Sequence, residues 1–475
     1  MTTTESGHIH VTYCEGWDPD SKTVIGAIPV AAARARHAAG EPYAVLLSAP
    51  PGKPLALLHI DGRSGYLGIF HFDDSARRVC EYDYRQLDDT TMHLRHYKLW
   101  GYTTADQPEF DAPIAFAVTI GRDGKARRIL NHQGTFDTRA LVPAEYHRMP
   151  PVHFGRWPFD ADCLTPPTPF EFVDTPDPAG PLQARASQPP WQAPAGLRPR
   201  HLEAMFTAGA LLRDTDGEIA EIREPVHAGL VHFPTGQVVA ADPGVLDPDH
   251  TPFTVTVPAG SYPMLVARMQ WQGRGWGENP AAKLQISSKQ TISWELAVTP
   301  GQDTRLLGHG EFYGFGVDSG TGAFLDASGC APLADAVERH WQDSPSNETT
   351  EYPEISDAAT GTNLFIYSAG RGDGCYPVWI GRDAEDEVTC FIADMLILDD
   401  AAPHPPTAEI RSPLAPSRHA LAPDDTDSHE PVAQPGATGA YFVNLFNKTI
   451  QDRQQALTSA DAFRAHARGA IIPPR

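Results

Sequence analysis

Runs of alternating apolar and polar residues follow one another from residue 7 to residue 163, with turn-forming residues between them. Closely spaced runs of this kind predict an antiparallel β-meander. Asp61-Gly62 and Asp123-Gly124 mark two of its turns, because both residue types tolerate tight backbone bends. An alanine- and arginine-rich segment at 31–39, followed by Gly40, predicts a short helix. The predicted strands span residues 43–48, 55–60, 66–72, 78–86, 92–99, 114–120 and 127–131.

The second half of the chain shows the same alternation in a separate series of short runs. Asp216-Gly217 and Thr235-Gly236 have the composition of hairpin turns. A different spacing places Leu333, Val337 and Trp341 four residues apart, so these three side chains share one face of a predicted helix. The predicted strands span residues 253–257, 264–270, 283–286, 291–298, 364–367, 376–380 and 388–397, and the predicted helices span residues 201–212 and 332–341.

Two stretches rich in proline, alanine and aspartate interrupt these patterns and divide the chain. The predicted parts are an N-terminal β-meander domain at 7–163, a proline-rich linker at 164–200, a second β-rich domain at 201–400, a tail at 401–440 and a C-terminal segment at 441–475 with a short helix at 460–468. The sequence therefore predicts a β-rich α+β fold, in which two mainly antiparallel β domains are joined by the linker and helices are few.

Composition narrows the range of partners. The chain has 475 residues, enough for two domains, and its 45 prolines and 40 glycines favour turns over long helices. Its net charge of -23 argues against a nucleic-acid partner, because phosphate binding needs a basic surface. No apolar run is long enough to span a bilayer, so no membrane partner is predicted. A small molecule or a protein is the expected partner.

The six cysteines are dispersed, and none forms a C-x-x-C pair, so a structural zinc site is not expected. Residues 1–10 are polar and lack the apolar core of a signal peptide. Free thiols in a reducing compartment fit this pattern, and we predict a cytoplasmic location.

Two glycine-rich stretches, 316–326 and 370–381, carry the most informative local pattern in the chain. Each sets an aspartate among glycines, between runs that predict strands. Glycine allows positive φ and close backbone approach, and aspartate offers two acceptor oxygens. Such segments either form tight hairpin turns or present carboxylates to a ligand, and the sequence leaves both readings open. The candidate ligand-binding residues are Gly320, Thr321, Gly322, Gly372, Gly374 and Tyr376.

An ordered set of segments carries a family resemblance over the second predicted domain. The segments are residues 233–243, 258–263, 294–297, 317–326 and 370–381, followed by Asp383 and Asp394. This set resembles a bacterial family described only as domain of unknown function 4241, over roughly residues 202–399. Ala369 departs from the Ser-Gly-aromatic pattern expected there. The resemblance implies a domain and a set of residues, and it implies no reaction.

Five acidic residues fall inside the resembling segments: Asp242, Glu295, Asp318, Asp326 and Asp373. If the sheet brought them together, their mutual repulsion would call for a cation or a proton. Oxygen ligands favour Mg²⁺ or Ca²⁺ over zinc, so Asp242, Asp318, Asp326 and Asp373 are candidate metal ligands. Glu295, Asp318 and Asp373 are then the candidate catalytic residues of a metal-assisted hydrolase that acts on a small anionic substrate. The alternative is structural, because Asp-Gly and Asp-Pro pairs form turns.

Other patterns lead to weaker hypotheses. Residues 317–321 fit the active-site pattern of aspartic proteases, but the mechanism needs a second aspartate, and the nearest echo, residues 136–139, has arginine where glycine is required. Residues 370–374 are compatible with a phosphate-binding nest of backbone amides. Three function classes therefore stand side by side: a hydrolase, a non-catalytic module that binds a ligand or a protein, and a structural or assembly protein.

Overall fold

The computed structural model divides the chain into two compact units. Within the described residues, the first unit runs to Gly196 and includes the short segment Arg305–His309, and the second holds Leu197–Thr304 and residues 310–404. The described residues are 7–49, 52–111, 114–130, 134–136, 142–159, 169–178, 191–274, 277–343 and 351–404. The predicted helix at 460–468 and all but the start of the predicted tail lie outside them.

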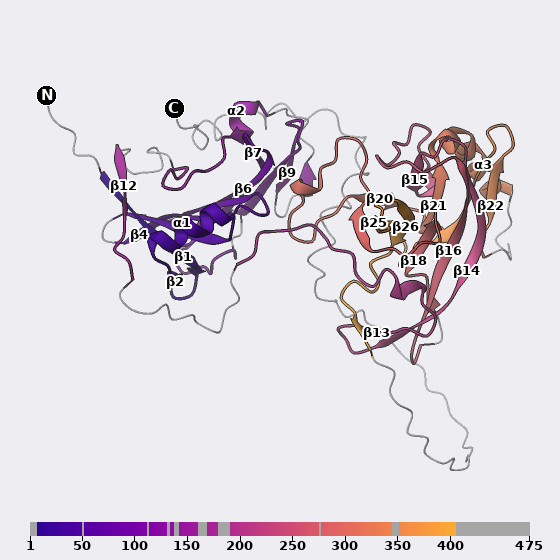
Figure 1. Cartoon of the computed structure of the whole chain (residues 1–475), viewed down its shortest axis with the longest axis horizontal. Helices are drawn as coiled ribbons and strands as arrows, with labels where there is room; N and C mark the ends of the chain where they lie inside the picture. The colour runs from indigo at the N-terminus through magenta and orange to yellow at the C-terminus, as the bar shows by residue number, and fades with distance from the viewer. Residues whose placement is uncertain are drawn as a thin grey trace, which may run out of the picture. The chain divides into compact units, whose positions relative to one another are not determined.

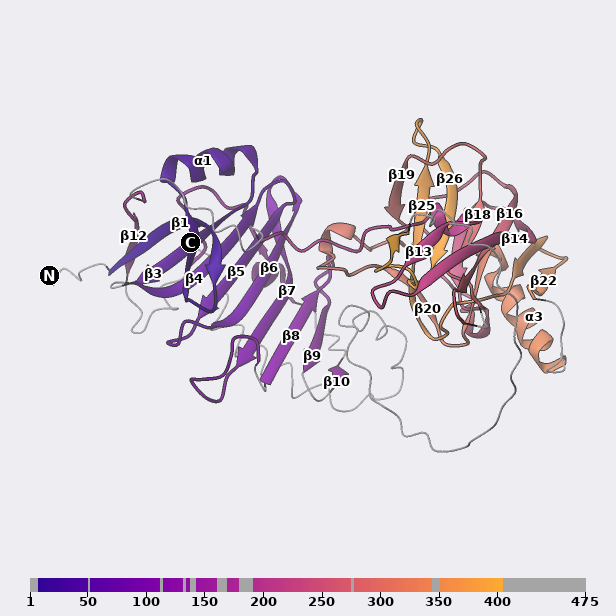
Figure 2. The ribbon, with the colours of Figure 1, turned by 90° about the horizontal axis from the view of Figure 1, so that it is seen from below.

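The first unit is built on one large sheet, whose strands lie side by side in Figure 2. In order across the sheet, its strands are β10 (Gly134–Phe136), β9 (Ala126–Leu130), β8 (Ile114–Ile120), β7 (Thr91–Gly101), β6 (Arg78–Asp88), β5 (Tyr66–Phe72), β4 (Lys53–Asp61), β3 (Tyr43–Ala49), β1 (Gly7–Asp18) and β12 (Phe170–Asp174). Two further strands, β2 (Thr23–Ala27) and β11 (Arg148–Met149), pair with β1 and β7. The neighbouring strands are antiparallel except β1 and β12, which are parallel.

The predicted meander is confirmed. Each of the seven predicted strands is present, with ends within two residues of the predicted ones. The predicted helix is α1 (Val30–Ala39), which ends where Gly40 takes φ 67° and its amide donates to the carbonyl oxygens of Arg36 and His37. A left-handed C-cap of this kind favours glycine, which has no Cβ to clash. A shorter helix, α2 (Ala144–His147), precedes β11.

Two strands of the first unit, β1 and β12, could not be predicted from alternation of apolar and polar residues. In β1, Val11 and Tyr13 pack into one hydrophobic cluster and Cys14 and Trp17 into another, so both faces are buried. A strand buried on both faces shows no clean alternation. β12 lies inside the stretch whose composition predicts a linker, yet it pairs with β1, and Phe170 and Phe172 pack against the core.

A buried ion cluster connects strands and loops of the first unit. The Asp83 carboxylate accepts hydrogen bonds from Arg85, at 2.6 and 3.1 Å, and from Arg95, at 2.9 Å. The two guanidinium groups also donate to the carbonyl oxygens of Pro194 and Leu306, at 2.8 and 2.9 Å. The cluster therefore ties Pro194, near the end of the unit's first chain segment, and Leu306, in its short second segment, to β6 and β7.

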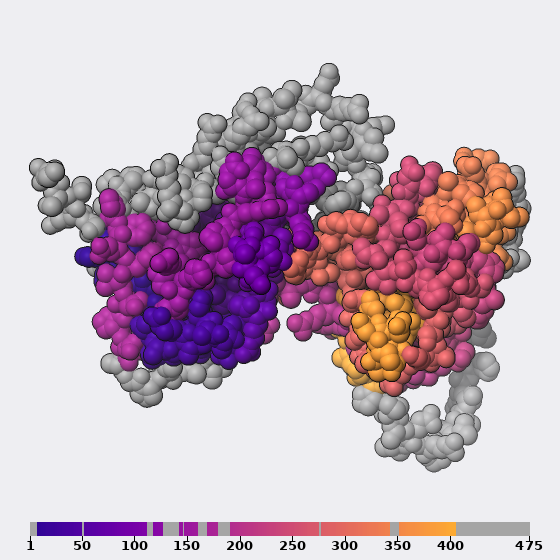
Figure 3. Space-filling model, turned by 45° about the horizontal axis from the view of Figure 1, so that its top comes forward, coloured from indigo at the N-terminus to yellow at the C-terminus, as the bar shows by residue number. Residues whose placement is uncertain are grey.

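The second unit contains one large antiparallel sheet and two smaller ones (Figure 1). In order, the large sheet holds β19 (Ser293–Leu296), β25 (Gly374–Arg382), β26 (Val388–Asp394), β18 (Ala281–Gln285), β16 (Gly260–Trp271), β14 (Ile219–Phe233), β13 (Leu211–Arg213) and β27 (Ala402–Pro403), with β17 (Gly277–Glu278) on β16 and β20 (Gly314–Val317) on β25. The smaller sheets are β15 (Val238–Ala241), β21 (Thr321–Asp326) and β24 (Tyr367–Ser368), and β22 (Glu354–Asp357) with β23 (Thr362–Phe365). The last described residues, in yellow, lie at the surface of this unit (Figure 3).

The β-rich, mainly antiparallel fold class predicted from the sequence is confirmed, but two predicted elements are wrong. The helix predicted at 201–212 is only a 3-10 turn, Ala204–Phe206, followed by β13. Gly209 takes φ 82°, which is incompatible with a right-handed helix, so the helix cannot continue through it. Residues 253–257 form no named strand and contribute a single bridge through Thr256. Val257 instead belongs to the buried core, and Phe253 and Val255 pack against that core.

The predicted helix at 332–341 is confirmed as α3 (Cys330–Asp343). Leu333 and Val337 are buried as expected, but Trp341, on the same predicted face, keeps 42% of its surface exposed. None of the helices among the described residues is long and apolar enough to cross a membrane.

Candidate functional site

The two glycine-rich stretches lie side by side in the second unit. β20 pairs with the start of β25, so that Val317 lies opposite Gly374, and Thr321 of β21 lies opposite Ser368 of β24. A Cβ added to Gly320 would lie 3.7 Å from the Cα of Gly372, which shows how closely the two backbones approach. The candidate ligand-binding residues of both stretches are thus neighbours.

Most of these neighbours have packing roles. The buried Tyr376 hydroxyl donates to the carbonyl oxygen of Gly372 at 2.8 Å, and burial raises the pKa of that phenol. Gly322 is covered by Tyr367, whose ring would lie 2.7 Å from an added Cβ. The Thr321 hydroxyl is 2.6 Å from that of Ser319. Their assignment to a ligand stays a prediction.

Asp242, a candidate metal ligand, is 2% exposed and organises a loop. One carboxylate oxygen accepts the amides of Asp318 and Ser319, both at 2.7 Å. The other accepts the amide of Gly244 at 2.7 Å and the hydroxyl of Ser319 at 2.5 Å. With four donors around it, this carboxylate fixes the turn between β20 and β21.

Asp326 is fully buried, and like Asp242 it accepts backbone amides that fix neighbouring turns. It accepts hydrogen bonds from the amides of Thr235, Gly236 and Ser328, at 2.9 to 3.0 Å, and from the hydroxyls of Thr235 and Ser328. In the ladder of β15 and β21 it lies opposite Val238, four residues before Asp242. At about 3.3 Å per residue, the two aspartates are therefore about 13 Å apart along the strands.

The remaining three predicted acidic residues are exposed. Asp318 and Asp373 leave the β20–β25 ladder at the same end, directly beyond the pair formed by Val317 and Gly374. Glu295 lies elsewhere: it is opposite Ile380, six residues along β25 from Gly374, or about 20 Å. Its carboxylate pairs with Arg382 at 2.5 Å.

The structure therefore does not bring the predicted carboxylates to one point. Among the described residues, no group of three or more His, Cys, Asp or Glu side chains has the geometry to hold a metal ion. The expected Mg²⁺ or Ca²⁺ site has no converging ligand set in this part of the chain, because two of its predicted ligands are saturated by backbone amides. The catalytic roles assigned to Glu295, Asp318 and Asp373 have no shared centre to support them.

Asp383 and Asp394, the acidic residues that follow the resembling segments, differ from each other. Asp383 lies 2.7 Å from the ammonium group of Lys289. Asp394, at the end of β26, accepts the Leu396 amide at 2.9 Å, and burial raises the pKa of its carboxyl to about 7. Asp394 lies opposite Ala281.

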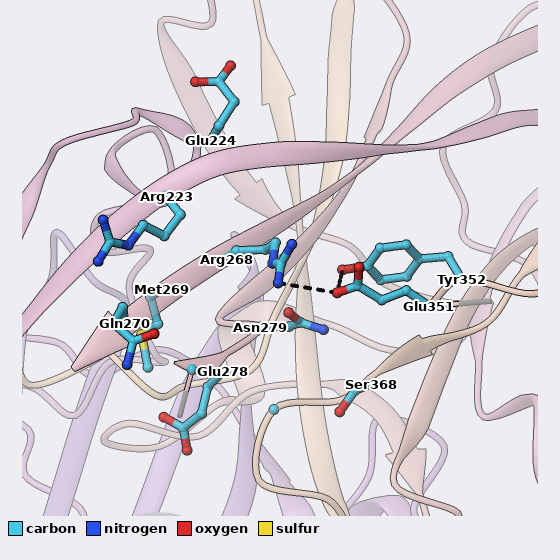
Figure 4. A pocket seen from close by; sticks show the side chains of 12 residues that line it. Arg223, Glu224, Arg268, Met269, Gln270, Glu278, Asn279, Glu351, Tyr352 and Ser368 are labelled. Carbon is cyan, nitrogen blue, oxygen red and sulfur yellow. Dashed lines mark hydrogen bonds and ion pairs between the residues drawn. The ribbon is translucent and has the colours of Figure 1, made fainter. Parts of the chain in front are cut away.

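A groove on the second unit, absent from the predicted site, is the strongest candidate for a binding site (Figure 4). Its volume is about 750 Å³, within the range that suits drug-sized ligands. It is lined by Arg223, Glu224, Arg268, Met269, Gln270, Gly277, Glu278, Asn279, Glu351, Tyr352, Ser368 and Gly370. Ser368 and Gly370 connect it to the second glycine-rich stretch.

Two arginines lie directly opposite each other on the paired strands β14 and β16. Arg223 and Arg268 are a cross-strand pair, and the ladder bulges immediately afterwards, at Glu224-Pro225. Like charges placed opposite each other destabilise a sheet unless other charges compensate. Arg223 pairs with Glu221 at 2.8 Å, whereas Arg268 reaches only to 3.5 Å from Glu351. Each guanidinium has five donors, so an anion in the groove has donors to bind.

Carboxylate acceptors also line the groove, and one of them, Glu351, lies against Arg268 (Figure 4). Glu351 accepts the Tyr352 hydroxyl at 3.2 Å, and burial, reinforced by Glu351, raises the pKa of Tyr352 to about 12. The Glu278 side chain is only 9% exposed, and one of its oxygens accepts the indole N–H of Trp271 at 2.8 Å. Its other oxygen is 3.8 Å from Arg371. The groove thus offers both cationic donors and carboxylate oxygens.

Sequence reasoning missed this groove because its residues come from five separate segments and form no local motif. One signal was present in the sequence: Pro225 lies inside a long run of strand-forming residues, and proline within a strand marks an edge or a bulge. Bulges re-aim side chains and are common beside functional sites.

Residues 231–393 match a family model described as "Protein of unknown function (DUF4241)". The family resemblance of the second unit is confirmed over these residues. The match covers about a third of the chain and most of the groove, but it does not reach Arg223, Glu224 or the first unit. Comparisons with curated proteins and with solved structures give no match.

Proposed function

We propose that the second unit is a non-catalytic binding module whose groove takes a small polar molecule. The ligand carries an anionic group, a carboxylate or a phosphate, that meets Arg223 and Arg268. Hydrogen-bond donors at its other end meet Glu278 and Glu351. The observation that carries this proposal is the half-exposed cross-strand arginine pair at the edge of a cavity of about 750 Å³.

The charge arrangement favours binding of an anion at this position. A planar guanidinium matches the geometry of carboxylate and phosphate groups and can bind them through two hydrogen bonds. The side chains of Arg223 and Arg268 are 51% and 47% exposed, so they remain accessible from solvent. Arg268 and Glu351, at 3.5 Å, form a loose ion pair that a better-placed anion can replace.

A hydrolase is the alternative that the predicted carboxylates favoured. It would need an acid–base pair or a metal-bound water at the substrate. Glu351 and Glu278 accept hydrogen bonds from Tyr352 and Trp271, and the predicted catalytic residues do not line the groove. Binding without chemistry therefore fits the geometry better.

The test is isothermal titration calorimetry of the full chain with inorganic phosphate and with glutamate. Arg268→Gln should weaken binding of either probe about tenfold or more, since hydrogen bonds to charged groups contribute about 1.5–3 kcal/mol. Arg213→Gln, an exposed arginine on β13 that does not line the groove, is the matched control and should bind as the wild type does. Unchanged affinity in Arg268→Gln, or no binding of either probe at millimolar concentration, would refute the proposal.

A further inference from the structure

Trp341 and Val245 form an apolar surface on the second unit, away from the groove. Trp341 is 42% exposed and Val245 is 60% exposed, although both side chains are large and apolar. Val245 ends a 3-10 turn, Pro243–Val245, and Trp341 lies in the last turn of α3. The two are joined through Gly244: a Cβ added there would lie 2.7 Å from the tip of the indole ring.

Ser319 lies against the same glycine. Its Cβ and hydroxyl oxygen would be 2.6 and 2.9 Å from the added Cβ, so Gly244 is enclosed between Ser319 and Trp341. A residue with any side chain would push one of them away. The first glycine-rich stretch therefore reaches this apolar surface at Ser319, which connects a sequence motif to the exposed tryptophan.

The surface is held in one conformation by the buried Asp242 carboxylate. It accepts the amides of Gly244, Asp318 and Ser319, and so ties the 3-10 turn to the loop between β20 and β21. A contact surface that is ordered before binding loses less conformational entropy when a partner docks. The exposure of Trp341 is thus a property of a fixed surface.

Three exposed aspartates lie on the loops next to the apolar residues. Asp318 precedes Ser319, Asp373 lies at the same end of the β20–β25 ladder, and Asp247 follows Val245 by two residues; all three are exposed. Arg371 is a nearby cation, and it is directed to Glu278 at 3.8 Å. Arg339 and His340 precede Trp341 on α3, and residues one and two positions apart on a helix do not share a face.

We propose that this surface, formed by Val245, Trp341, Ser319, Asp318 and Asp373, docks a segment of a partner protein that presents a lysine or arginine beside an aliphatic side chain. We call it the Trp341 surface. The aliphatic group packs on the indole and Val245, and the cation meets Asp318 and Asp373. Exposed tryptophans dominate binding energy at protein interfaces, and complementary charge directs the approach of the partner.

The exposure of the residues identifies the class of partner. Val245 and Trp341 are exposed and do not line the groove, whereas small-molecule sites are concave. A lysine or arginine side chain can pack its stem on an apolar ring and keep its charged end beside a carboxylate. An acidic segment would instead be repelled by the same aspartates.

The experiment uses the full chain labelled with 5-fluorotryptophan and ¹⁹F NMR. Trp341→Phe identifies the Trp341 resonance by its disappearance. The probes are two peptides of alternating sequence, Lys-Leu-Lys-Leu and Glu-Leu-Glu-Leu, added at low ionic strength. The basic peptide should shift the Trp341 resonance in a saturable way, and the acidic peptide should not. A shift with both peptides, or with neither at millimolar concentration, would overturn the proposal.

Substitutions of exposed residues give a second readout. Asp318→Asn combined with Asp373→Asn should weaken binding of the basic peptide about fivefold or more, because two attractive charges are lost. Asp216→Asn, which removes an exposed aspartate from a hairpin of the same unit, is the matched control and should bind as the wild type does. Equal affinity in the double variant and the control contradicts the proposal. Arg268→Gln should leave peptide binding unchanged, which separates this surface from the groove.

Discussion

Asp83 in the first unit and Glu351 in the second are both carboxylates that face arginine, but only Asp83 is enclosed by its partners. Asp83, Arg85 and Arg95 are 2%, 4% and 5% exposed, and every contact within the cluster is a short hydrogen bond. Around Glu351, the Arg268 contact is 3.5 Å long, and both side chains are about half exposed.

The comparison separates charges that hold the fold from charges that are accessible to a ligand. Buried ions that are fully hydrogen-bonded cannot lose a partner cheaply, because the remaining charge is left without solvent. Half-exposed ions keep their hydration and exchange partners at little energetic cost. The first arrangement therefore fits a structural role, and the second fits a surface that binds.

The largest effect is expected from Asp83→Asn. Removing this charge takes the shared carboxylate from two buried guanidinium groups, and we expect a loss of about 3–5 kcal/mol in the free energy of unfolding. The check is chemical denaturation, compared with Glu351→Gln, which should cost less than about 1 kcal/mol. Equal losses in the two variants would remove the distinction between the two charge clusters.

Asp394 sharpens the comparison, because it is a buried carboxyl whose pKa is raised by burial. Its folded pKa is raised to about 7 from the ordinary 3.8, so the folded state retains a proton that the unfolded chain loses. Its contribution to stability is complete below pH 4 and decreases as the pH rises from about 4 to about 7, by up to about 4 kcal/mol.

Denaturation across this pH range should show that Asp394→Asn removes that decrease, so the variant gains stability relative to the wild type at neutral pH. The same pH profile in both proteins would show that Asp394 is ionised in the folded state.

A smaller effect is expected from the aspartates of the resembling segments. Asp326→Asn should cost about 1–3 kcal/mol, since the amides of Thr235 and Gly236 lose their charged acceptor. Asp318→Asn, on an exposed side chain, should change stability by less than about 0.5 kcal/mol. Thermal unfolding of both variants tests this, and a large loss in Asp318→Asn would count against a solvent-facing role.

The smallest effect on stability is expected in the groove. Arg268→Gln should lower the free energy of unfolding by less than about 1 kcal/mol, and added salt should reduce even this difference. Denaturation at low and high ionic strength is the measurement. A loss as large as that of Asp83→Asn would mean that the groove arginines hold the fold.

Much of the fold could be predicted from periodicity. β5 and β8 have the predicted ends, and Gly40 ends α1 as expected. β1 and the strand β12 in the expected linker were missed, because one is buried on both faces and the other is recognised only through its pairing partner. Helix periodicity placed Trp341 on the buried face of α3, but the residue keeps 42% of its surface exposed.

The candidate site was harder to predict. The sequence indicated that the glycine-rich stretches matter, and they do lie together, but it could not show which acceptors of Asp242 and Asp326 were already used. These hydrogen bonds join residues 76 to 91 positions apart in the chain. The groove depends on the pairing of Arg223 with Arg268, which is a matter of strand register, and register is set by the whole sheet.

The parallel pairing of β1 with β12 has a consequence for synthesis of the protein. His8 pairs with Glu171, so 163 residues must be translated before the outer edge of β1 is covered. At about 5–20 residues per second, that edge waits roughly 10–30 s on the ribosome. During that time its unpaired amides are available to other nascent chains. A pause or a truncation before residue 170 should therefore favour aggregation of the emerging polypeptide.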